Sequence, residues 1–496
     1  MASLHPQLQP FEPTSDRPFD AMLAAHLLSR AGFGGKPEEI AQVMKIGPSR
    51  AVDQLLDFPD ASAEEQSQTD VPDLSSIDGY PKSFSDLKKM YQGKTQEEIK
   101  ALRQKIMMAN REAIEAVSTW WMRRMANGPH PLQEKLTLFW HGHFTTSAKD
   151  EKAATLIWNQ NELLRRQSAG NYREFVRQIS RDPAMLDYLN NNENRKAHPN
   201  ENYARELMEL FTLGIGNYTE TDIKQAARAF TGWAHDDDDF VFRKFNHDTG
   251  IKTFFGYSGN FDGDDIIDII LHSKPSMPFI SGELFSYFAY DDADPAMIDS
   301  LGDVLRDSKF ELRPLIRTIL KSKAFYSEAA LGTQIKSPIQ LMVGTTRLLD
   351  LQMPPARFLT DSMRQMGQIP LMPPNVKGWP GGRQWINTST IFVRYNTAVS
   401  LVGGGSGGNV GNRGPLFNRL AQARAGGREA LDPDRVGPRG TPAQVVDGWV
   451  ERMIQRPISS EKRSVLLEAL GERADDPQSV RRMVQLIVSM PDYQLC

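Results

Sequence analysis

Cysteine is almost absent from this chain, whose 496 residues include one cysteine, Cys496. A disulfide within the chain needs two cysteines and a zinc cluster of thiolates needs several, so the sequence excludes both. Cysteine usage therefore gives no information on the redox compartment in which the protein works.

An excess of charge of one sign is lacking as well. Lys and Arg number 58 and Asp and Glu number 62, which gives a formal net charge of −4. Proteins that bind nucleic acid normally carry a basic face. The balance therefore favours a protein with no nucleic-acid partner.

Long hydrophobic runs are also missing. No stretch approaches the roughly 18 apolar residues that a membrane-spanning helix requires. Residues 1–20 show no basic segment followed by the apolar core of a signal peptide. We therefore expect no membrane span and, for the sequence as it stands, a cytoplasmic protein. A periplasmic or secreted protein is the alternative if a leader has been removed.

Apolar residues at helical spacing are abundant. Leu23, Leu27 and Ala31 recur at i, i+4 and i+8. Thr95-x-x-Glu98 is a capping box, and it opens a run without proline or glycine that extends to residue 127. Further helical patterns cover residues 131–139, 151–167, 171–189, 201–213, 219–231 and most of 264–351. We predict a mainly α protein with one large multi-helix domain.

Some segments depart from this helical pattern. Phe240 and Phe242 on one side of residues 247–250, and residues 251–255 on the other, predict a β-hairpin insertion near 240–255. Residues 59–94 have little periodicity and predict an exposed loop. The proline-rich residues 352–387 predict an ordered but irregular segment.

The length of the chain suggests several units. We expect an N-terminal helix and extended loop region over residues 1–94 and a main helical domain over 95–400. Residues 401–414 are rich in glycine and predict a linker. A helical C-terminal extension is expected over 415–496.

Two histidines, His141 and His143, follow a helical pattern and are separated by Gly142. On extended backbone, residues two apart point to the same side, which offers two ring nitrogens to one divalent metal ion. The glycine favours such a break in the helix. We therefore consider both histidines as metal ligands or proton-transfer groups. The alternative is that they cap the helix and pack against Trp140 and Phe144.

Glu206 lies at the border of the apolar face of the helix predicted over 201–213. A carboxyl group that leans inward can act as a general acid or base with a raised pKa, or as a further metal ligand beside the two histidines. The alternative is a buried ion pair with Arg30 or Arg228. Glu209, on the same helix, is expected to face water.

A proline- and glycine-rich segment carries Trp379 and Trp385. Rigid exposed aromatic rings stack on sugars or apolar ligands, so the two indoles predict a binding wall. Lys377 and Arg383 beside them are suited to hold an acidic group. The alternative is that both indoles fill a gap between domains.

Four further side chains are candidates for substrate binding. His26 and Arg30 flank the apolar stripe of the first helix, and Asn202 lies one turn before Glu206. His247 lies in the turn of the expected hairpin. Because Asp and Gly beside it are turn-forming residues, a structural role for His247 carries more weight.

Five sequence blocks resemble one protein family. They are residues 25–34 (AHLLSRAGFG), 139–144 (FWHGHF), 200–214 (NENYARELMELFTLG), 259–265 (GNFDGDD) and 374–379 (PNVKGW). In this order they resemble the bacterial domain of unknown function 1800 family, from about residue 20 to the end of the chain. The resemblance implies a large, mostly helical protein without an agreed activity.

The resemblance to this family also implies a cellular context. Members of the family often look exported and are encoded beside proteins similar to alkaline phosphatases and sulfatases, one of which is a possible neighbour protein here. This context implies metabolism of an envelope or extracellular polymer. We expect a hydrolase or lyase that acts on a polysaccharide or other polymer substrate, with Glu206 as acid or base. The alternative hypothesis is a non-catalytic helical protein that binds a glycan or assembles with a partner.

Overall fold

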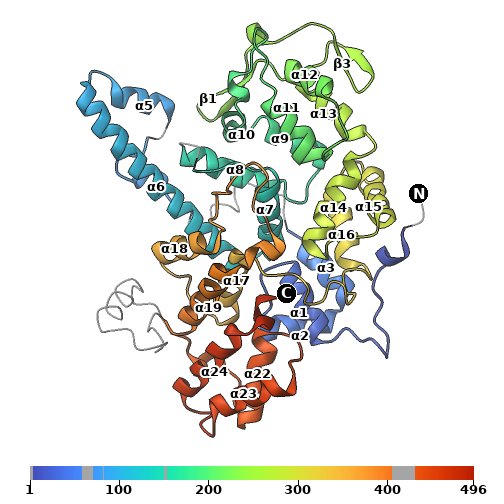
Figure 1. Cartoon of the computed structure of the whole chain (residues 1–496), viewed down its shortest axis with the longest axis vertical. Coiled ribbons are helices and arrows are strands. Elements are labelled where there is room, and N and C mark those ends of the chain that lie inside the picture. The colour runs from blue at the N-terminus through green and yellow to red at the C-terminus, as the bar shows by residue number, and fades with distance from the viewer. Residues whose placement is uncertain (1–3, 59–70, 82, 150–152, 405–429) are drawn as a thin grey trace.

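The computed structural model describes residues 4–58, 71–81, 83–149, 153–404 and 430–496 (Figure 1). These residues form many α-helices and two small two-stranded sheets. The prediction of a mainly α protein with a small β insertion is therefore confirmed. No helix among the described residues is both long and apolar enough to cross a membrane.

The first part of the chain forms two groups of helices. The group after the N-terminus is α1 (Ala21–Arg30), α2 (Pro37–Ile46) and α3 (Pro48–Leu56). A hairpin of α5 (Phe84–Tyr91) and the long α6 (Gln96–Asn127) then projects from the upper left of the molecule in Figure 1.

The helices of the central part carry most of the motifs. They are α7 (Pro131–His143), α8 (Ala154–Arg166), α9 (Tyr172–Ser180), α10 (Pro183–Tyr188), α11 (Asn202–Glu206), the π-helix η4 (Leu207–Thr212) and α12 (Glu220–Ala229). After the β insertion come α13 (Gly263–His272), α14 (Ser276–Phe288), α15 (Pro295–Asp307) and α16 (Leu312–Lys321).

The last part of the chain is again helical. It comprises α17 (Pro338–Leu348), α18 (Ala356–Met366), the short η6 (Gly382–Trp385), α19 (Thr388–Val402), α21 (Pro433–Val436), α22 (Pro442–Met453), α23 (Ser460–Leu470) and α24 (Pro477–Ser489). The expected linker over 401–414 lies largely outside the described residues, and its first two residues still belong to α19.

Local sequence signals place several helix starts correctly. The Thr95 side chain accepts a hydrogen bond from the Glu98 N–H and the Glu98 carboxylate accepts one from the Thr95 N–H. Asp262 and Asp265 form the same reciprocal pair at the start of α13. These boxes satisfy N–H groups that have no partner in the first helical turn.

Two hydrophobic cores hold the helices together. The first core gathers buried residues of α1–α3, α9–α16 and η4, and the second gathers those of α6, α17–α19 and α22–α24. Leu136 and Trp140 of α7 belong to the first core, whereas Leu138 belongs to the second. Helix α7 therefore lies between the two cores.

The sheets differ from the single expected hairpin in their pairing. Strand β1 (Trp233–Asp236) pairs with β2 (Asp239–Phe242), and β3 (Lys252–Phe254) pairs with β4 (Tyr257–Gly259), both antiparallel. Phe255 and Gly256 take positive φ values of 49° and 81°, and they form the tight two-residue turn between β3 and β4. Each strand thus pairs with its nearest neighbour, and residues 243–251 connect the two hairpins.

Three predictions of segment structure were wrong. The loop expected over 59–94 contains α5, whose N-cap is Ser83, while residues 59–70 lie outside the described residues. The irregular segment 352–387 contains α18, which ends at Gly367 with a φ of 88°. The helix expected over 171–189 breaks into α9 and α10 because Pro183 starts a new helix, capped by Asp182.

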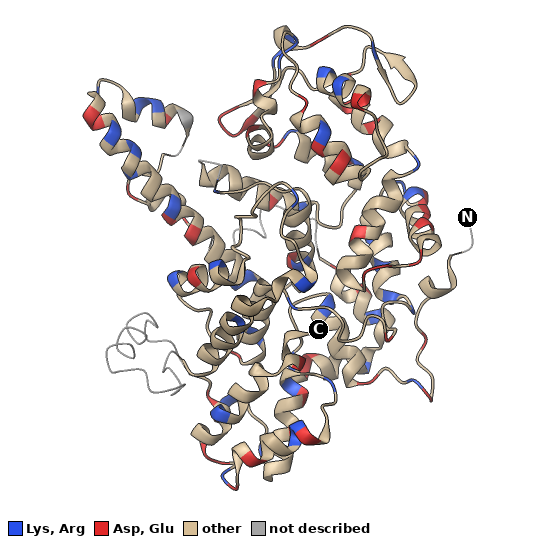
Figure 2. Ribbon diagram, in the orientation of Figure 1, with Lys and Arg blue, Asp and Glu red and all other residues tan. Residues whose placement is uncertain are grey.

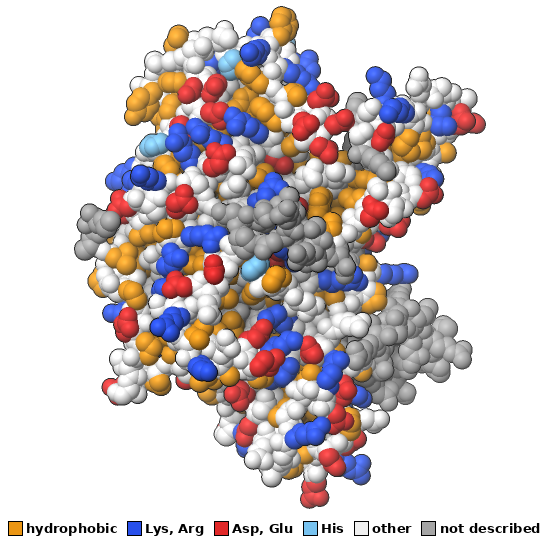
Figure 3. All heavy atoms as spheres, turned by 180° about the vertical axis from the view of Figure 1, so that it is seen from behind, with side chains coloured by type: hydrophobic (Ala, Val, Ile, Leu, Met, Phe, Trp, Pro, Cys, Tyr) orange, Lys and Arg blue, Asp and Glu red, His pale blue; other side chains and the backbone are white. Residues whose placement is uncertain are grey.

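Charged side chains of both signs are spread over the molecule. Lys and Arg alternate with Asp and Glu along the helices in Figure 2, and they are interspersed on the opposite face in Figure 3. Neither view shows the continuous basic face that a nucleic-acid-binding protein would present.

Candidate functional site

Helix α7 ends on the His-Gly-His motif. The helix continues through His143, and the Phe144 N–H still donates to the Trp140 carbonyl over 2.7 Å. The expectation of extended backbone at residues 141–143 was therefore wrong. Residues two apart on a helix point about 200° apart, so the two imidazoles face different surroundings.

His141 lies between two indole rings. Its side chain is 1% exposed, and its ring centroid lies 5.5 Å from that of Trp121 and 5.4 Å from that of Trp379. Burial lowers the pKa of His141 to about 4. Its Nε2 has no hydrogen-bond partner among the described residues. His141 is therefore a neutral side chain packed in an aromatic environment.

His143 points to the neighbouring helix. Its Nε2 lies 3.0 Å from the carbonyl oxygen of Phe211, and its ring stacks on Phe139 at a centroid distance of 5.7 Å. Burial lowers the pKa of His143 to about 4. Because a carbonyl only accepts, Nε2 carries the proton of the neutral ring. His143 thus fixes the position of the Phe211 backbone.

The segment that His143 contacts is the π-helix η4. The Leu213 N–H donates to the Met208 carbonyl, five residues earlier, over 3.0 Å. At this end of the helix the Phe211 carbonyl accepts from His143 and also from the Tyr172 hydroxyl over 2.9 Å. Single π turns inside α-helices occur often at functional sites. The sequence analysis expected one regular helix here, so the π-helix is a correction.

The loop over residues 374–379 packs against the end of α7. Gly378 has a φ of 75°, and a Cβ added there would lie 2.3 Å from the Gly142 carbonyl oxygen. Only glycine permits this approach of two backbones. In Figure 1 the orange segment after α18 lies beside α7. We call the contact of the α7 end, α11–η4 and residues 374–379 the seam.

Glu206 lies at the seam and is half-buried. Burial and the charge of Glu209 raise its pKa, while the charges of Arg205 and Lys377 act in the opposite direction. Neither ion pair weighed for it from the sequence forms. The Arg30 guanidinium donates to the Ala330 carbonyl.

The other arginine considered as a partner of Glu206 is also engaged. Arg228 pairs with Asp248 at a nitrogen–oxygen distance of 2.7 Å. Glu206 therefore keeps a carboxyl group that is partly desolvated and has no strong ion pair in the described residues. A carboxyl group whose pKa is raised by burial is suited to act as a general acid or base.

Glu209 and Tyr218 complete this polar cluster, and the sequence analysis missed both. Glu209 is half-buried rather than directed fully to water, and its Oε2 accepts from the Tyr218 hydroxyl over 2.8 Å. Burial and this hydrogen bond raise the pKa of Tyr218 to about 12. The Glu-x-x-Glu spacing was the available signal, since residues three apart on a helix are neighbours.

The expected metal site has no support in this geometry. Among the described residues, no three His, Cys, Asp or Glu side chains are grouped so that they could hold a metal ion. His141 is directed to Trp121 and Trp379, and His143 to the Phe211 carbonyl. Ligation by His141, His143 and Glu206 together stays a prediction from the sequence.

The tryptophan loop differs from an exposed binding wall. Trp385 is 5% exposed, so it cannot stack on a ligand, and its carbonyl accepts from Thr390. Trp379 is half-buried against His141. Lys377 and Arg383 are exposed, and Lys377 acts electrostatically on Glu206.

The remaining candidates use their side chains to bind backbone carbonyls, and this includes Asn202, although it starts α11. The ring of His26 lies with its Nε2 3.0 Å from the Phe325 carbonyl, and burial and Arg30 lower its pKa to about 3. The Asn202 amide donates to the Leu189 carbonyl over 3.1 Å. The Nδ1 of His247 lies 2.8 Å from the Thr231 carbonyl. These side chains support the backbone.

Comparison with known proteins identifies the family. Searches of curated proteins and of solved structures returned no match. The family described as "Protein of unknown function (DUF1800)" matches residues 26–495, which is nearly the whole chain and includes every element of the seam. The chain therefore belongs to the DUF1800 family.

Proposed function

We propose that this chain is a hydrolase or lyase that cleaves a carbohydrate-like or envelope polymer by acid–base chemistry at the seam. The observation that carries the proposal is the Glu206–Glu209 pair. Both carboxyl groups lie on one helical segment, both are half-buried, and the pKa of Glu206 is raised by burial and by its neighbour.

Two carboxyl groups in different environments are suited to divide the roles of acid and base. Glu209 accepts a hydrogen bond from Tyr218, whereas Glu206 has none from a side chain in the described residues. In hydrolysis, the protonated Glu206 would give its proton to the leaving oxygen while Glu209 takes one from the attacking water. In elimination, the Glu209 carboxylate would instead remove a proton from a sugar carbon, a carbon–carbon double bond would form as the carbon–oxygen bond breaks, and Glu206 would give its proton to the leaving oxygen.

The surroundings of the pair supply binding groups. Lys377 is exposed and close enough to lower the pKa of Glu206, so it can attract an acidic unit of the polymer. Trp379 offers part of an aromatic ring beside it. His143 acts as a positioning residue, because it holds the carbonyl of Phe211 in the π-helix that carries Glu209.

The proposal is tested by measuring product release from a panel of neutral and acidic polysaccharides. New reducing ends indicate hydrolysis, and ultraviolet absorbance of an unsaturated sugar indicates elimination. Glu206→Gln should lower turnover by about a hundredfold or more while polymer binding is retained. Glu112→Gln, an exposed change on α6, is the matched control and should retain full turnover.

A polymer that binds wild type and Glu206→Gln equally, with no product from either, would overturn the enzymatic proposal. That result would instead favour a non-catalytic glycan-binding or assembly protein.

A further inference from the structure

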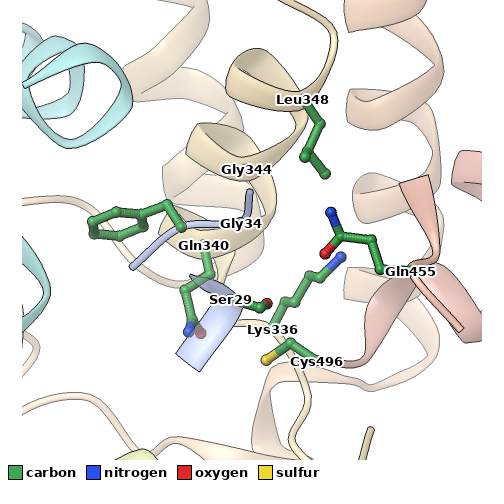
Figure 4. Close-up of a pocket in the computed structure, with 9 residues that line it drawn as sticks. Ser29, Gly34, Lys336, Gln340, Gly344, Leu348, Gln455 and Cys496 are labelled. Carbon is green, nitrogen blue, oxygen red and sulfur yellow. The ribbon is translucent and has the colours of Figure 1, made fainter. Parts of the chain in front are cut away.

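A groove lies where α9, α13 and the connection between α15 and α16 meet. Two cavities of about 390 Å³ each adjoin there and share the His272 side chain, and their size is in the range of small-molecule sites. The cavity in Figure 4 has a volume of about 20 Å³, which is room for one water molecule. The groove is therefore large enough for an organic ligand, whereas the cavity in Figure 4 is not.

The first cavity of the groove presents positive charge. Its lining residues are Asn171, Arg173, His272, Arg306, Lys309 and Phe310. Among the described residues, no acidic side chain lines it. Arg306 and Lys309 are exposed, and the Lys309 ammonium has no ion-pair partner in the described part of the chain. Cations on the wall of a cavity attract acidic ligands.

The acidic side chains nearby are engaged by other cations. Asp268 accepts from the Nε and Nη2 of Arg173, and it also pairs with Arg177 at 2.9 Å, so two guanidinium groups share one carboxylate. The Nη1 of Arg173 has no partner among the described residues. Asp303 pairs with Arg306 at 2.6 Å. Donors of the cavity wall are therefore left for a ligand.

His272 adds an acceptor where the two cavities meet. Its Nδ1 lies 2.8 Å from the carbonyl oxygen of Asp268. Because a carbonyl only accepts, Nδ1 carries the proton of the neutral ring and Nε2 is an acceptor. A sugar hydroxyl can donate to this nitrogen. The groove thus combines an acceptor with its cations, which suits an acidic sugar better than a bare inorganic anion.

The second cavity adds aromatic surface. Phe255 and Tyr257 of the β3–β4 hairpin line it, and Tyr257 is 64% exposed. In the first cavity the Phe310 ring lies 5.4 Å from that of His272. Exposed aromatic rings offer flat apolar surfaces on which sugar rings stack.

The loop that carries Lys309 and Phe310 has an unusual backbone conformation. The two residues have positive φ values of 57° and 69°. Hydrogen bonds from the start of α9 hold them, because the Asn171 amide donates to the Lys309 carbonyl over 2.9 Å and the Tyr172 N–H donates to the Phe310 carbonyl over 2.8 Å. Such conformations in residues other than glycine are costly and occur often at binding sites. The cavity wall is therefore preorganised.

Tyr172 connects the groove to the seam. Its N–H binds the Phe310 carbonyl at the groove, and its hydroxyl donates over 2.9 Å to the Phe211 carbonyl, in the π-helix that carries Glu209. The side chain is fully buried. One rigid residue thus contacts both the groove and the seam.

We propose that the groove binds an acidic sugar unit of the polymer on which the seam acts. Arg306 and Lys309 hold its carboxylate or sulfate group, the Nε2 of His272 accepts from a hydroxyl, and Tyr257 stacks on a neighbouring ring. The inference rests on the proposed function for the identity of the polymer, but binding at the groove requires no turnover.

Isothermal titration calorimetry tests this binding with the whole chain carrying Glu206→Gln, so that cleavage does not interfere. The ligands are polygalacturonate, dextran sulfate and neutral dextran at constant ionic strength. At least one of the two acidic polymers should bind about tenfold more tightly than dextran, or more. The preference between these two polymers shows whether the groove takes a carboxylate or a sulfate group.

The double change Lys309→Gln and Arg306→Gln removes two exposed cations from the groove. It should weaken binding of the acidic polymer about tenfold or more and leave the melting temperature unchanged. Tyr257→Ala should weaken it several-fold. The matched control is Lys100→Gln with Arg103→Gln, two exposed changes on the projecting helix α6, and it should bind like the parent.

Three results would overturn the inference. One is equal affinity for dextran and for both acidic polymers. Another is a groove double variant that binds like the parent, or a control that weakens binding by as much. The third is unchanged binding by Tyr257→Ala, which would show attraction by charge alone. Loss of binding in the groove variant without product from the wild type would support the groove and overturn the enzymatic proposal. Product release with unchanged binding by the groove variant would do the reverse.

Discussion

At the residue scale, the two histidines of the FWHGHF motif show how one helical turn gives two side chains different tasks. His141 is enclosed by indole rings and leaves one ring nitrogen unpaired among the described residues, whereas His143 binds a backbone carbonyl. Their pKa values are lowered for the same reason, burial, so both are neutral at pH 7. What distinguishes them is the partner, which the sequence does not show.

This difference predicts opposite effects of the same substitution. His143→Phe removes a donor from the Phe211 carbonyl, which then keeps Tyr172 as its side-chain partner among the described residues, and should destabilise the fold by about 1 kcal/mol. His141→Phe removes a buried nitrogen without a partner and adds apolar surface, so the free energy of unfolding should stay equal or increase. Urea denaturation of both variants measures the difference. An equal loss of stability in the two would contradict the assignment.

At the element scale, the predictable features are those that depend on neighbours in sequence. The capping box at Thr95 was predicted because both of its members lie within one turn, and the box at Asp262 is of the same local kind. The continuation of α7 through Gly142 was not predicted. The backbone of Gly142 is in close contact with Gly378, which lies far along the chain, and the sequence does not show this contact. The π-helix was not predicted either, because it also depends on contacts with distant segments. Its free carbonyl is stabilised by His143 and Tyr172 from two other helices.

The close approach of Gly378 and Gly142 predicts a strong and local effect of adding one methyl group. In Gly378→Ala the new Cβ would lie 2.3 Å from the Gly142 carbonyl oxygen at a φ of 75°, so the loop must move away from α7. We expect the free energy of unfolding to fall by roughly 2–4 kcal/mol, from the unfavourable backbone conformation and the clash together. The activity of Glu206 should fall as well, because Lys377 moves with the loop.

The matched control for this prediction is Gly381→Ala. Gly381 has a φ of 67°, but a Cβ added there meets no atom within 4 Å. The free energy of unfolding of Gly381→Ala should fall by about 1–2 kcal/mol, from the unfavourable backbone conformation alone, and the seam should stay intact. Chemical denaturation of the two variants separates the clash from the backbone effect. If Gly378→Ala were no less stable than Gly381→Ala, the backbone contact at the seam would be wrong.

At the scale of the whole molecule, the arrangement of two cores around α7 determines which candidates meet. Lys377 acts on Glu206 and the Trp379 ring contacts His141 because α7 touches both cores and the seam lies at its end. His26 and Arg30 instead face residues 325–330, and His247 faces Thr231. Sequence reasoning placed Glu206 at the border of an apolar face, and it is half-buried, but Trp385 was expected to be exposed and is buried. Sequence reasoning could not group the candidates, because grouping depends on contacts between helices that are distant in the chain.

The buried lysines give a prediction for the stability of the whole fold at alkaline pH. Burial lowers the pKa of Lys135 and of Lys336 from 10.5 to about 8, with Arg30 acting in the same direction on Lys135 and Arg456 and Arg394 on Lys336. Above pH 8 the folded chain loses these two protons while the unfolded chain keeps them. The unfolded state then binds more protons, so the free energy of unfolding should rise from about pH 8 towards pH 10.

The upper end of this window is set by buried tyrosines, whose pKa values are raised by burial, among them Tyr172, Tyr287 and Tyr326. Unfolding releases their protons above about pH 10, which reverses the slope. Urea denaturation as a function of pH should therefore show increasing stability between these limits, and Lys336→Met should remove about half of the increase. Stability that falls steadily from pH 8 would contradict the prediction, because it would mean that the two ammonium groups are solvated or paired in the folded chain.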